Sequence, residues 1–482
     1  MKNLKKYLAL LVAIMLLVGC SSNDKGPGAD TDFDELPAMT TDEITLTVAT
    51  WQQPSLQTAL KDAFEDKYPN ITIELIEVDG EAWMDSLTNL ASAGNLPDVF
   101  WYQGDVDIAI RNGWLGDLTP YWNADPESED VLDSLKDQGV YTMVDGDVKK
   151  LSAASAYQPY TIYLDENLFT RYNVDMPATD WKWSDMISLM EEMTIPEDGI
   201  FGYNTYTQLL TMSPIVNGDA VGEFGWDGES YDLTGYWASA LQQHAEFVQS
   251  GVHAPFFDTD EAEAAFGDRL LWSASSGRVA MQLDAWWTTS LFSTPEFVDK
   301  GIKWVPYSVP QGDNAQTLNK PAFVDFGSIS PTADYPREAY EALKWFGWGS
   351  EGHAVKLNHF KTAVLESGDK EFSYPDGLPL VKKQALWDEV LDQFTTKLEA
   401  DGNGDQVKYY ADFLDNVKSP IPLGGAVHPG FGTFLGEQYF AGEYGNVESE
   451  VIEGNLRAAD IASDLTNRLN QSREETMAEL FD

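Results

Sequence analysis

Residues 43–78 read EITLTVATWQQPSLQTALKDAFEDKYPNITIELIEV, and the spacing of apolar side chains changes twice within them. Apolar residues first alternate with polar ones over 44–48, which is typical of a β-strand. They then recur at helical spacing over 56–64, and Pro69 ends this amphipathic helix. Alternation returns after Pro69. A strand, a helix and a second strand in this order predict a parallel sheet covered by helices.

The rest of the chain continues this alternation, which places it in the α/β class. In parallel sheets ligands bind at the carboxyl ends of strands, and TWQQP (50–54) and WYQGD (101–105) stand at two such ends. At 482 residues the chain exceeds one ordinary domain, so two lobes are expected. Further strands are predicted at 97–102, 151–165, 277–285, 302–310 and 321–330, and helices at 81–94, 181–251, 335–350, 382–399 and 447–482.

The chain is strongly acidic, with 79 Asp and Glu residues against 30 Lys and Arg residues and a formal net charge of −49. Such a surface repels nucleic acid and anionic lipid, and it disfavours phosphorylated or other anionic substrates. The simpler interpretation is that the charge only keeps the protein in solution. Because 12% of the residues are aromatic and cations are few, a neutral polyhydroxylated ligand fits the composition.

The N-terminus, MKNLKKYLALLVAIMLLVGC, has the organisation of an export signal. Lysines precede an apolar run that is too short to span a bilayer comfortably. Because LVGC resembles the bacterial lipobox, we predict a signal peptide over 1–19, a diacylated Cys20, and a flexible tether completing 20–41. The protein would then be anchored at the extracellular face of the cell membrane. The alternative is an ordinary secretory signal. Cys20 is the only cysteine, so no disulfide forms within the chain.

Seven segments of the sequence occur in a characteristic order. They are TWQQP, ALKDAFEDKYPNITIEL, LTNLASAGNLPDVFWY, NGWLGDLTPYW, YTIYLDENLF, SSGRVAMQLDAWW and GSISPTADYPREAYEALKWF. From about residue 42 to the C-terminus, the chain resembles the bacterial extracellular solute-binding proteins of family 1. This is the maltodextrin-binding type, which serves carbohydrate ABC importers.

The resemblance implies a two-lobed periplasmic-binding-protein-like fold, with an interlobe cleft and a hinge of crossing strands. Lobe one would comprise residues 42–152 and 321–371, and lobe two residues 153–320 and 372–482. Ligand would bind in the cleft, and the lobes would close over it. No cofactor is implied.

The resemblance also implies which side chains contact the ligand. They are Trp51, Gln52, Gln53, Tyr102, Gln103, Asp105, Phe323 and Asp325 from lobe one, and Tyr157, Gln158, Tyr206, Asp284, Trp287, His428 and Phe431 from lobe two. Aromatic faces would cover sugar rings, and carboxylates and amides would bind hydroxyls. The residues alone leave structural roles open. Asp105 and Asp325 could cap the elements that follow them, the two loop glutamines could be ordinary polar residues, and His428 could be structural.

Two adjacent tryptophans end the strand predicted within VAMQLDAWWTTS, residues 279–290. If they continue the strand, their side chains point to opposite faces. The family spacing from Met281 selects Trp287 as a sugar platform. Trp286 is then left for the core of lobe two.

Metal and catalytic motifs are weak or missing. DGNGD, with Asp401, Asn403 and Asp405, resembles the start of a calcium loop, but Gln406 and Asp412 stand where glycine and glutamate are expected. A solvated turn is the simpler interpretation, and we predict no metal. The chain has no G-x-S-x-G, H-E-x-x-H or P-loop motif.

We therefore expect a lipid-anchored, monomeric receptor that captures a neutral oligosaccharide and delivers it to an ABC permease without chemistry. Two alternatives stay open. One is a secreted glycoside hydrolase with an acidic pair in an aromatic groove. The other is a binding protein for another neutral or cationic solute, such as a polyamine.

Overall fold

A computed structural model describes residues 33–80, 82–102, 106–144, 146–205, 209–365, 367, 370–424 and 427–481. The predicted signal peptide, Cys20 and most of the predicted tether lie outside the described residues, as do Gln103, Asp105 and Tyr206.

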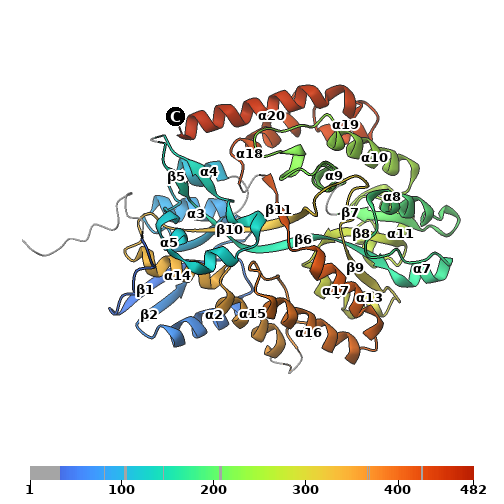
Figure 1. The fold of residues 1–482 in the computed structure, drawn as a ribbon. Helices are drawn as coiled ribbons and strands as arrows, with labels where there is room; N and C mark the ends of the chain where they lie inside the picture. Colours follow the sequence, from blue (N-terminus) through green and yellow to red (C-terminus); the bar gives the residue numbers. More distant parts are fainter. Residues whose placement is uncertain are drawn as a thin grey trace, which may run out of the picture.

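One mixed sheet passes through both halves of the molecule (Figure 1). Within the described residues its strands follow the order β2-β1-β3-β10-β6-β8-β7, with β11 beside β10 and β9 beside β6. β1 pairs in parallel with β2 and β3, whereas β10 runs antiparallel to β3 and β6. The predicted α/β class is confirmed. The strands are β1 (Ile44–Ala49), β2 (Ile71–Leu75), β3 (Val99–Tyr102), β6 (Ala153–Asp165), β7 (Phe201–Thr205), β8 (Val279–Ala285), β9 (Trp304–Ser308), β10 (Lys320–Ile329) and β11 (Pro420–Pro422), and a separate hairpin of β4 (Val140–Thr142) and β5 (Val148–Lys150).

Helices surround both ends of this sheet. In Figure 1, α2, α14 and α15 gather around the β1–β3 end, while α7, α8, α10 and α11 gather around the β7–β8 end. The helices of the first half of the chain are α2 (Pro54–Lys67), α3 (Trp83–Ser92), α4 (Val106–Arg111), α5 (Thr119–Ala124), α6 (Asp133–Lys136), α7 (Glu166–Tyr172), α8 (Trp183–Glu192), α9 (Leu209–Gly218) and α10 (Tyr236–Ser250). Those of the second half are α11 (Asp260–Phe266), α12 (Thr288–Phe292), α13 (Pro295–Val298), α14 (Pro336–Phe346), α15 (Ser350–Thr362), α16 (Gln384–Ala400), α17 (Val407–Asn416), α18 (Phe431–Phe434), α19 (Val447–Ile452) and α20 (Ala458–Phe481).

Two large hydrophobic clusters lie on either side of the strands that cross the molecule. The first surrounds β1, β2 and β3, and the second surrounds β7, β8 and α10. β6 contributes Tyr157 to the first and Ile162 to the second, so this one strand joins both cores. Phe394 of α16 and Phe413 of α17 belong to the first cluster, although both fall within predicted lobe two. The lobe boundaries stay predictions.

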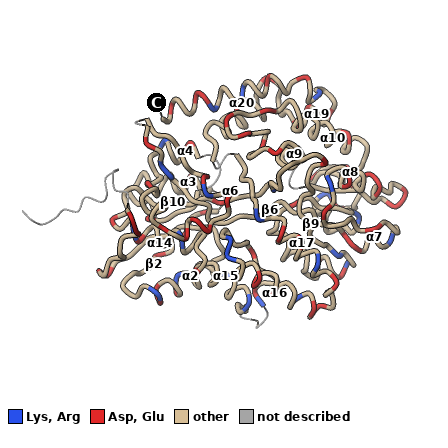
Figure 2. The backbone as a smooth tube through the Cα atoms, viewed as in Figure 1, with Lys and Arg blue, Asp and Glu red and all other residues tan. Residues whose placement is uncertain are grey.

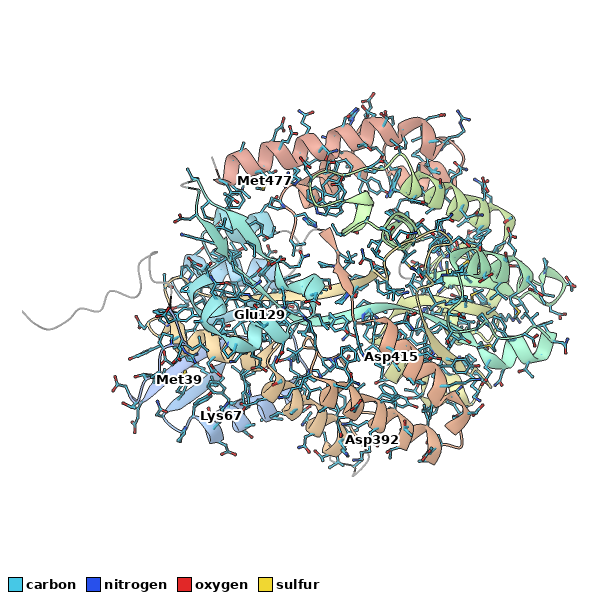
Figure 3. All side chains as sticks on the ribbon, in the orientation of Figure 1. Met39, Lys67, Glu129, Asp392, Asp415 and Met477 are labelled. Atoms are coloured by element: carbon cyan, nitrogen blue, oxygen red, sulfur yellow. The ribbon has the colours of Figure 1, made fainter. Side chains whose placement is uncertain are left out.

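The C-terminal helix α20 also spans both clusters. Leu465 and Leu469 pack in the second cluster, whereas Phe481 belongs to the first and Met477 packs against it (Figure 3). At the β1–β3 end of the sheet, Lys67 at the end of α2 forms an ion pair with Glu351 of α15.

Among the helices of the described part of the chain, none combines the length and the apolar character needed to cross a membrane.

Acidic residues are spread over both halves of the molecule (Figure 2). They occur on helices at both ends of the sheet and along α20 rather than in one patch. This distribution agrees with the acidic composition of the chain.

The predicted helical stretch over 181–251 contains a strand, β7, which the sequence pattern did not reveal. FGYNT has no clear alternation, and the strand forms because it pairs in parallel with β8. A Cβ atom at Gly202 would lie only 1.9 Å from the carbonyl oxygen of Met190. Glycine therefore allows α8 to approach the strand closely.

The two adjacent tryptophans do not continue the strand, so the predicted strand geometry is wrong. β8 ends at Ala285, and Trp287 already has helical φ and ψ angles of −55° and −25° at the start of α12. Trp286 is buried, as predicted, but it stacks on Phe413 of α17 at a ring-centroid distance of 4.7 Å. It therefore packs with α16 and α17 rather than within the second cluster.

Candidate functional site

The two crossing strands β6 and β10 present one half-exposed face near the middle of the sheet. Phe323 pairs with Gln158, and Asp325 pairs with Ala156. Directly paired residues in an antiparallel ladder lie on the same face, and so do residues two apart along a strand. Phe323, Asp325 and Gln158 therefore share a face, and all three are half-buried.

Trp51 lies at one end of this face. Its indole Nε1–H donates a hydrogen bond to Oδ2 of Asp325 over 3.1 Å. The ring contacts Trp83 and Trp101 edge-on, each at a centroid distance of 5.1 Å. These contacts fix the position of the half-buried indole while part of its surface stays accessible.

Trp287 lies at the other end. Its ring is 4.7 Å from that of Phe323, with an angle of 47° between the planes. Phe323 and Asp325 are two residues apart, which separates them by about 6.6 Å along the strand. Trp51, Asp325, Phe323 and Trp287, with Gln158 beside them, thus form a row that we call the hinge strip.

A cavity of about 120 Å³ adjoins the hinge strip. It holds roughly four water volumes, which is less than a whole sugar ring needs. Five of the side chains predicted from the sequence line it, and they are Trp51, Gln52, Gln53, Gln158 and Asp325. Other lining residues were not predicted, among them Trp101, His353, Lys356 and Asp376.

The ionisable groups of this cavity are shifted toward their neutral forms. Burial, helped by the nearby charge of Asp376, raises the pKa of Asp325 to about 7, although the Trp51 hydrogen bond opposes the shift. Asp325 is half-buried as a whole, but its carboxylate is shielded by the indole that donates to it. Burial lowers the pKa of Lys356 to about 7. Burial also raises the pKa of Asp376, against the hydrogen bond that it accepts from Gln158.

Three buried polar atoms of the cavity lining have no hydrogen-bond partner among the described residues. They are Nε1 of Trp101, Oε1 of Gln158 and Nε2 of His353. Burial lowers the pKa of His353 to about 3, so this ring is neutral at physiological pH. Because buried polar groups are nearly always satisfied, these atoms indicate a place where water or ligand hydroxyls bind.

Three predicted contact residues are buried and do not line this cavity. The hydroxyl of Tyr102 donates to Ser152 Oγ at 3.0 Å, and that of Tyr157 donates to the carbonyl of Val417 at 3.3 Å. Phe431 packs edge-on against Phe224. In this arrangement their rings serve the hydrophobic clusters.

Asp284 is buried behind Trp287. Its carboxylate accepts hydrogen bonds from the side chain of Gln282 at 3.1 Å and from the backbone N–H of Ala285 at 2.8 Å. Burial raises its pKa to about 6, and a side-chain hydrogen bond with Trp287 opposes that shift. Asp284 is thus placed to orient the Trp287 indole.

His428 lies away from the hinge strip cavity. Its ring is tilted against Trp226 at a centroid distance of 5.0 Å, and burial lowers its pKa to about 4. A neutral histidine packed among rings agrees with the structural role left open by the sequence.

Both aspartates of the segment that resembles the start of a calcium loop lie close to lysines. Asp401 forms an ion pair with Lys397, and Asp405 lies 3.9 Å from Nζ of Lys303. Within the described residues no group of three or more Asp, Glu, His or Cys side chains could hold a metal ion.

The missed cavity residues had no signal in the sequence. Asp376 belongs to an irregular segment between α15 and α16, and His353 and Lys356 lie three residues apart on one side of α15. Only the tertiary fold brings these three residues close to Asp325. Helical spacing with burial would have classed α15 as an ordinary core helix.

The fold resembles that of solved binding proteins at low sequence identity. An ABC substrate-binding protein from Listeria monocytogenes, in complex with cycloalternan, matches with a TM-score of 0.62 and 16% identity over 89% of this chain and 99% of that one. The cyclic alpha-maltosyl-1,6-maltose binding protein of Arthrobacter globiformis matches at 0.59 and 17% over 90% and 99%. The GacH receptor of Streptomyces glaucescens, solved unliganded and with acarbose, matches at 0.58 and 16% over 90% and 99%. The chain thus has the two-lobed fold of periplasmic binding proteins.

The sequence pattern of a family covers more than half of the chain. Residues 49–347 match the bacterial extracellular solute-binding proteins. The protein belongs to this family, as its ordered segments predicted.

Proposed function

We propose that the protein captures a neutral carbohydrate, of oligosaccharide size, outside the cell and delivers it to the permease of an ABC importer. It acts as a monomer, binds and releases its ligand without chemistry, and closes its lobes over it. The ligands named for the structural relatives support a carbohydrate. The acidic composition disfavours an anionic ligand.

The observation that carries this proposal is the hinge strip. Trp51 and Trp287 supply two ring faces at its ends, and Asp325 and Gln158 supply polar atoms between them. Flat apolar faces with oriented donors and acceptors between them are what a chain of sugar rings requires.

A thermal-shift screen over neutral mono- and oligosaccharides tests the proposal. A ligand that binds only the folded state raises the melting temperature. Spermidine belongs in the panel because the carboxyl groups of Asp325 and Asp376, which line one cavity, would also suit a cation. Stabilisation by spermidine alone would replace the carbohydrate with a polyamine, and stabilisation by no sugar would reject the proposal.

Lobe closure is expected to be visible in solution. The cavity beside the hinge strip is about 120 Å³, whereas pockets for drug-sized ligands are about 300–1,000 Å³, so an oligosaccharide requires opening and reclosure. Small-angle scattering should give a smaller radius of gyration with the best thermal-shift sugar than without it. A sugar that causes no thermal shift is the control, and an unchanged radius at saturation would contradict closure.

The mature protein is expected to begin at an acylated Cys20. The apolar run that precedes LVGC and the predicted tether support a lipid anchor at the extracellular face of the membrane. Cys20→Ser should release the protein into the medium, as measured by fractionation and blotting. Ser21→Ala is the matched control and should stay with the membrane. A membrane-bound Cys20→Ser protein would show that the anchor is something else.

A glycoside hydrolase is a second candidate because Asp325 and Asp376 are two carboxyl groups in one cavity with raised pKa values. Hydrolases use such pairs as acid and base. Incubation with the stabilising oligosaccharide, followed by mass spectrometry, separates the two functions. Shortened products would indicate the hydrolase, and intact ligand supports the receptor.

A further inference from the structure

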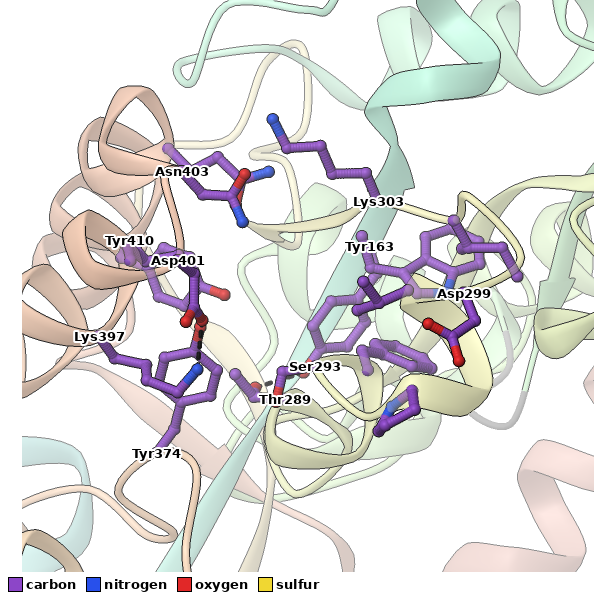
Figure 4. Close-up of a pocket in the computed structure, with 17 residues that line it drawn as sticks. Tyr163, Thr289, Ser293, Asp299, Lys303, Tyr374, Lys397, Asp401, Asn403 and Tyr410 are labelled. Carbon is purple, nitrogen blue, oxygen red and sulfur yellow. Dashed lines mark hydrogen bonds and ion pairs between the residues drawn. The ribbon is translucent and has the colours of Figure 1, made fainter. Parts of the chain in front are cut away.

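A second, larger cavity lies on the far side of the segment that carries Tyr374 and Asp376. Its volume is about 380 Å³, against about 120 Å³ beside the hinge strip, and the two share no lining residue. α12, α13 and β9 form one wall, and the end of α16 with the loop after it forms the other. Figure 4 shows Tyr374, Lys397 and Asp401 facing Tyr163 and Asp299 across the open space.

Aromatic rings from both walls border this cavity. Trp304 and Phe292 pack together at a centroid distance of 5.3 Å on one wall. Tyr410 and Tyr374 lie on the other, with a centroid distance of 6.2 Å and an angle of 29° between the ring planes. Two facing aromatic walls suit a flat molecule with apolar faces.

One buried hydrogen-bond donor in this lining is unpaired within the described residues. Trp304 is only 6% exposed, and its Nε1–H has no hydrogen-bond partner among the described residues. Leaving a buried donor unpaired costs free energy, so the site requires an acceptor from water or a ligand. Asn403 adds a half-buried amide to the opposite wall, and the Thr289 hydroxyl lies 2.7 Å from that of Tyr163.

The charges of the lining balance. Lys303 and Lys397 face Asp299 and Asp401, which gives two cations and two anions in a chain whose formal charge is −49. Lys397 pairs with Asp401, and Lys303 pairs with Glu166 at 2.7 Å. With both lining lysines already paired, the cavity offers no free cation to an anionic ligand, and the remaining lining carboxylate, that of Asp299, is exposed to solvent.

We propose that this cavity is a second binding site, separate from the hinge strip, for a neutral polyol the size of one sugar ring. Its volume corresponds to roughly a dozen water volumes, and thus to about a dozen non-hydrogen atoms. The polyol stacks between the aromatic walls and places a hydroxyl oxygen on the Trp304 indole N–H. The site does not depend on the function proposed for the hinge strip.

Nuclear magnetic resonance of the tryptophan indoles tests this site. The purified full-length protein is labelled with ¹⁵N at the indole nitrogens, and Trp304→Phe identifies the Trp304 signal. Titration with D-glucose or myo-inositol should shift that signal to saturation. Trp237, which is buried in α10 and borders neither cavity, is the matched control and should not shift.

Two variants distinguish binding in this cavity from binding at the hinge strip. Val298 borders the cavity and is 56% exposed, so Val298→Trp can fill the space without disturbing a core and should abolish the shift. Asp325→Ala alters only the hinge strip and should retain it. A Trp304 shift that disappears in Asp325→Ala would mean that the indole reports lobe closure, which overturns the proposal.

The remaining outcomes of the titration also test the site and the neutral class of its ligand. Absence of a saturable shift with both polyols would reject the site, and a shift that persists in Val298→Trp would place binding elsewhere. Sodium glucuronate and spermidine serve as charged probes. If either saturates the Trp304 signal at lower concentration than the neutral polyols do, the neutral class is wrong.

Discussion

Trp286→Ala is expected to lower the free energy of unfolding by about 3–5 kcal/mol, as large-to-small changes of buried aromatic residues do. Trp286 is 1% exposed and stacks on Phe413 with an angle of 12° between the rings. It also meets Phe394 edge-on at 5.2 Å. Its removal leaves a cavity between the end of β8 and two helices that are distant in sequence. Denaturant titration followed by circular dichroism measures the loss.

Trp287→Ala is the matched control, because it removes the same side chain one position later. Trp287 is half-buried and rests on Phe323, so the unfolding midpoint without ligand should change little. Binding of the best thermal-shift sugar should weaken by about 1–3 kcal/mol, by analogy with stacking of bases on aromatic side chains. If Trp286→Ala weakens binding while Trp287→Ala binds like the parent protein, the two roles are reversed.

The tryptophan pair shows how far the sequence carried the prediction. The family spacing assigned different roles to Trp287 and Trp286, and the two rings do have different neighbours. The expected cause was strand alternation, yet β8 has already ended at Ala285. The change from strand to helical backbone at Trp287 separates the rings instead. Strand alternation could not reveal this change because the strand ends just before the pair.

Most strands and helices could be predicted because their apolar spacing is regular. β1, α2 and β2 follow the pattern of residues 43–78 closely. β7 could not be predicted, since Gly202 and Asn204 interrupt its pattern and pairing with β8 stabilises it. A strand of this kind depends on tertiary contacts that a single segment does not show.

Some residues of the candidate site could be predicted from strand ends and the family resemblance. Others could not, because only the tertiary fold brings them to the site. Trp51 was identified at a strand end and Asp325 from the family resemblance, and the structure brings them into hydrogen-bond contact. Lys356 and Asp376 come from a helix and a loop whose sequences carry no binding motif. Their importance arises from proximity to Asp325, whose pKa both of them shift.

That proximity gives Asp325 a central place in the hinge strip. Its carboxylate accepts the Trp51 N–H and lies within the electrostatic reach of Asp376 and Lys356. It therefore couples one aromatic end of the strip to the polar cavity. A ligand hydroxyl that donates to this carboxylate would also offset the effect of burial on its charge.

Asp325→Ala is expected to weaken sugar binding by about 1.5–3 kcal/mol, or roughly 10- to 150-fold, which is the range for a hydrogen bond to a charged group. The change removes the acceptor for the ligand hydroxyl and also leaves the Trp51 indole without its partner at 3.1 Å. Isothermal titration calorimetry with the best thermal-shift sugar measures it. Asp165→Asn is the control, because Asp165 is also buried, has a pKa of about 6, and caps α7 away from the cavity.

The pH dependence of binding distinguishes a charge effect from a loss of packing. Because the pKa of Asp325 is about 7 in the folded protein, its carboxylate is ionised above that pH and protonated below it. Asp325→Asn keeps the shape but cannot ionise. Its affinity should fall furthest behind that of the parent protein above pH 7, and the gap should narrow as the pH drops through 7, where the parent loses its charge. A gap that stays constant across this range would show that Asp325 acts by packing, and equal affinities throughout would remove it from the site.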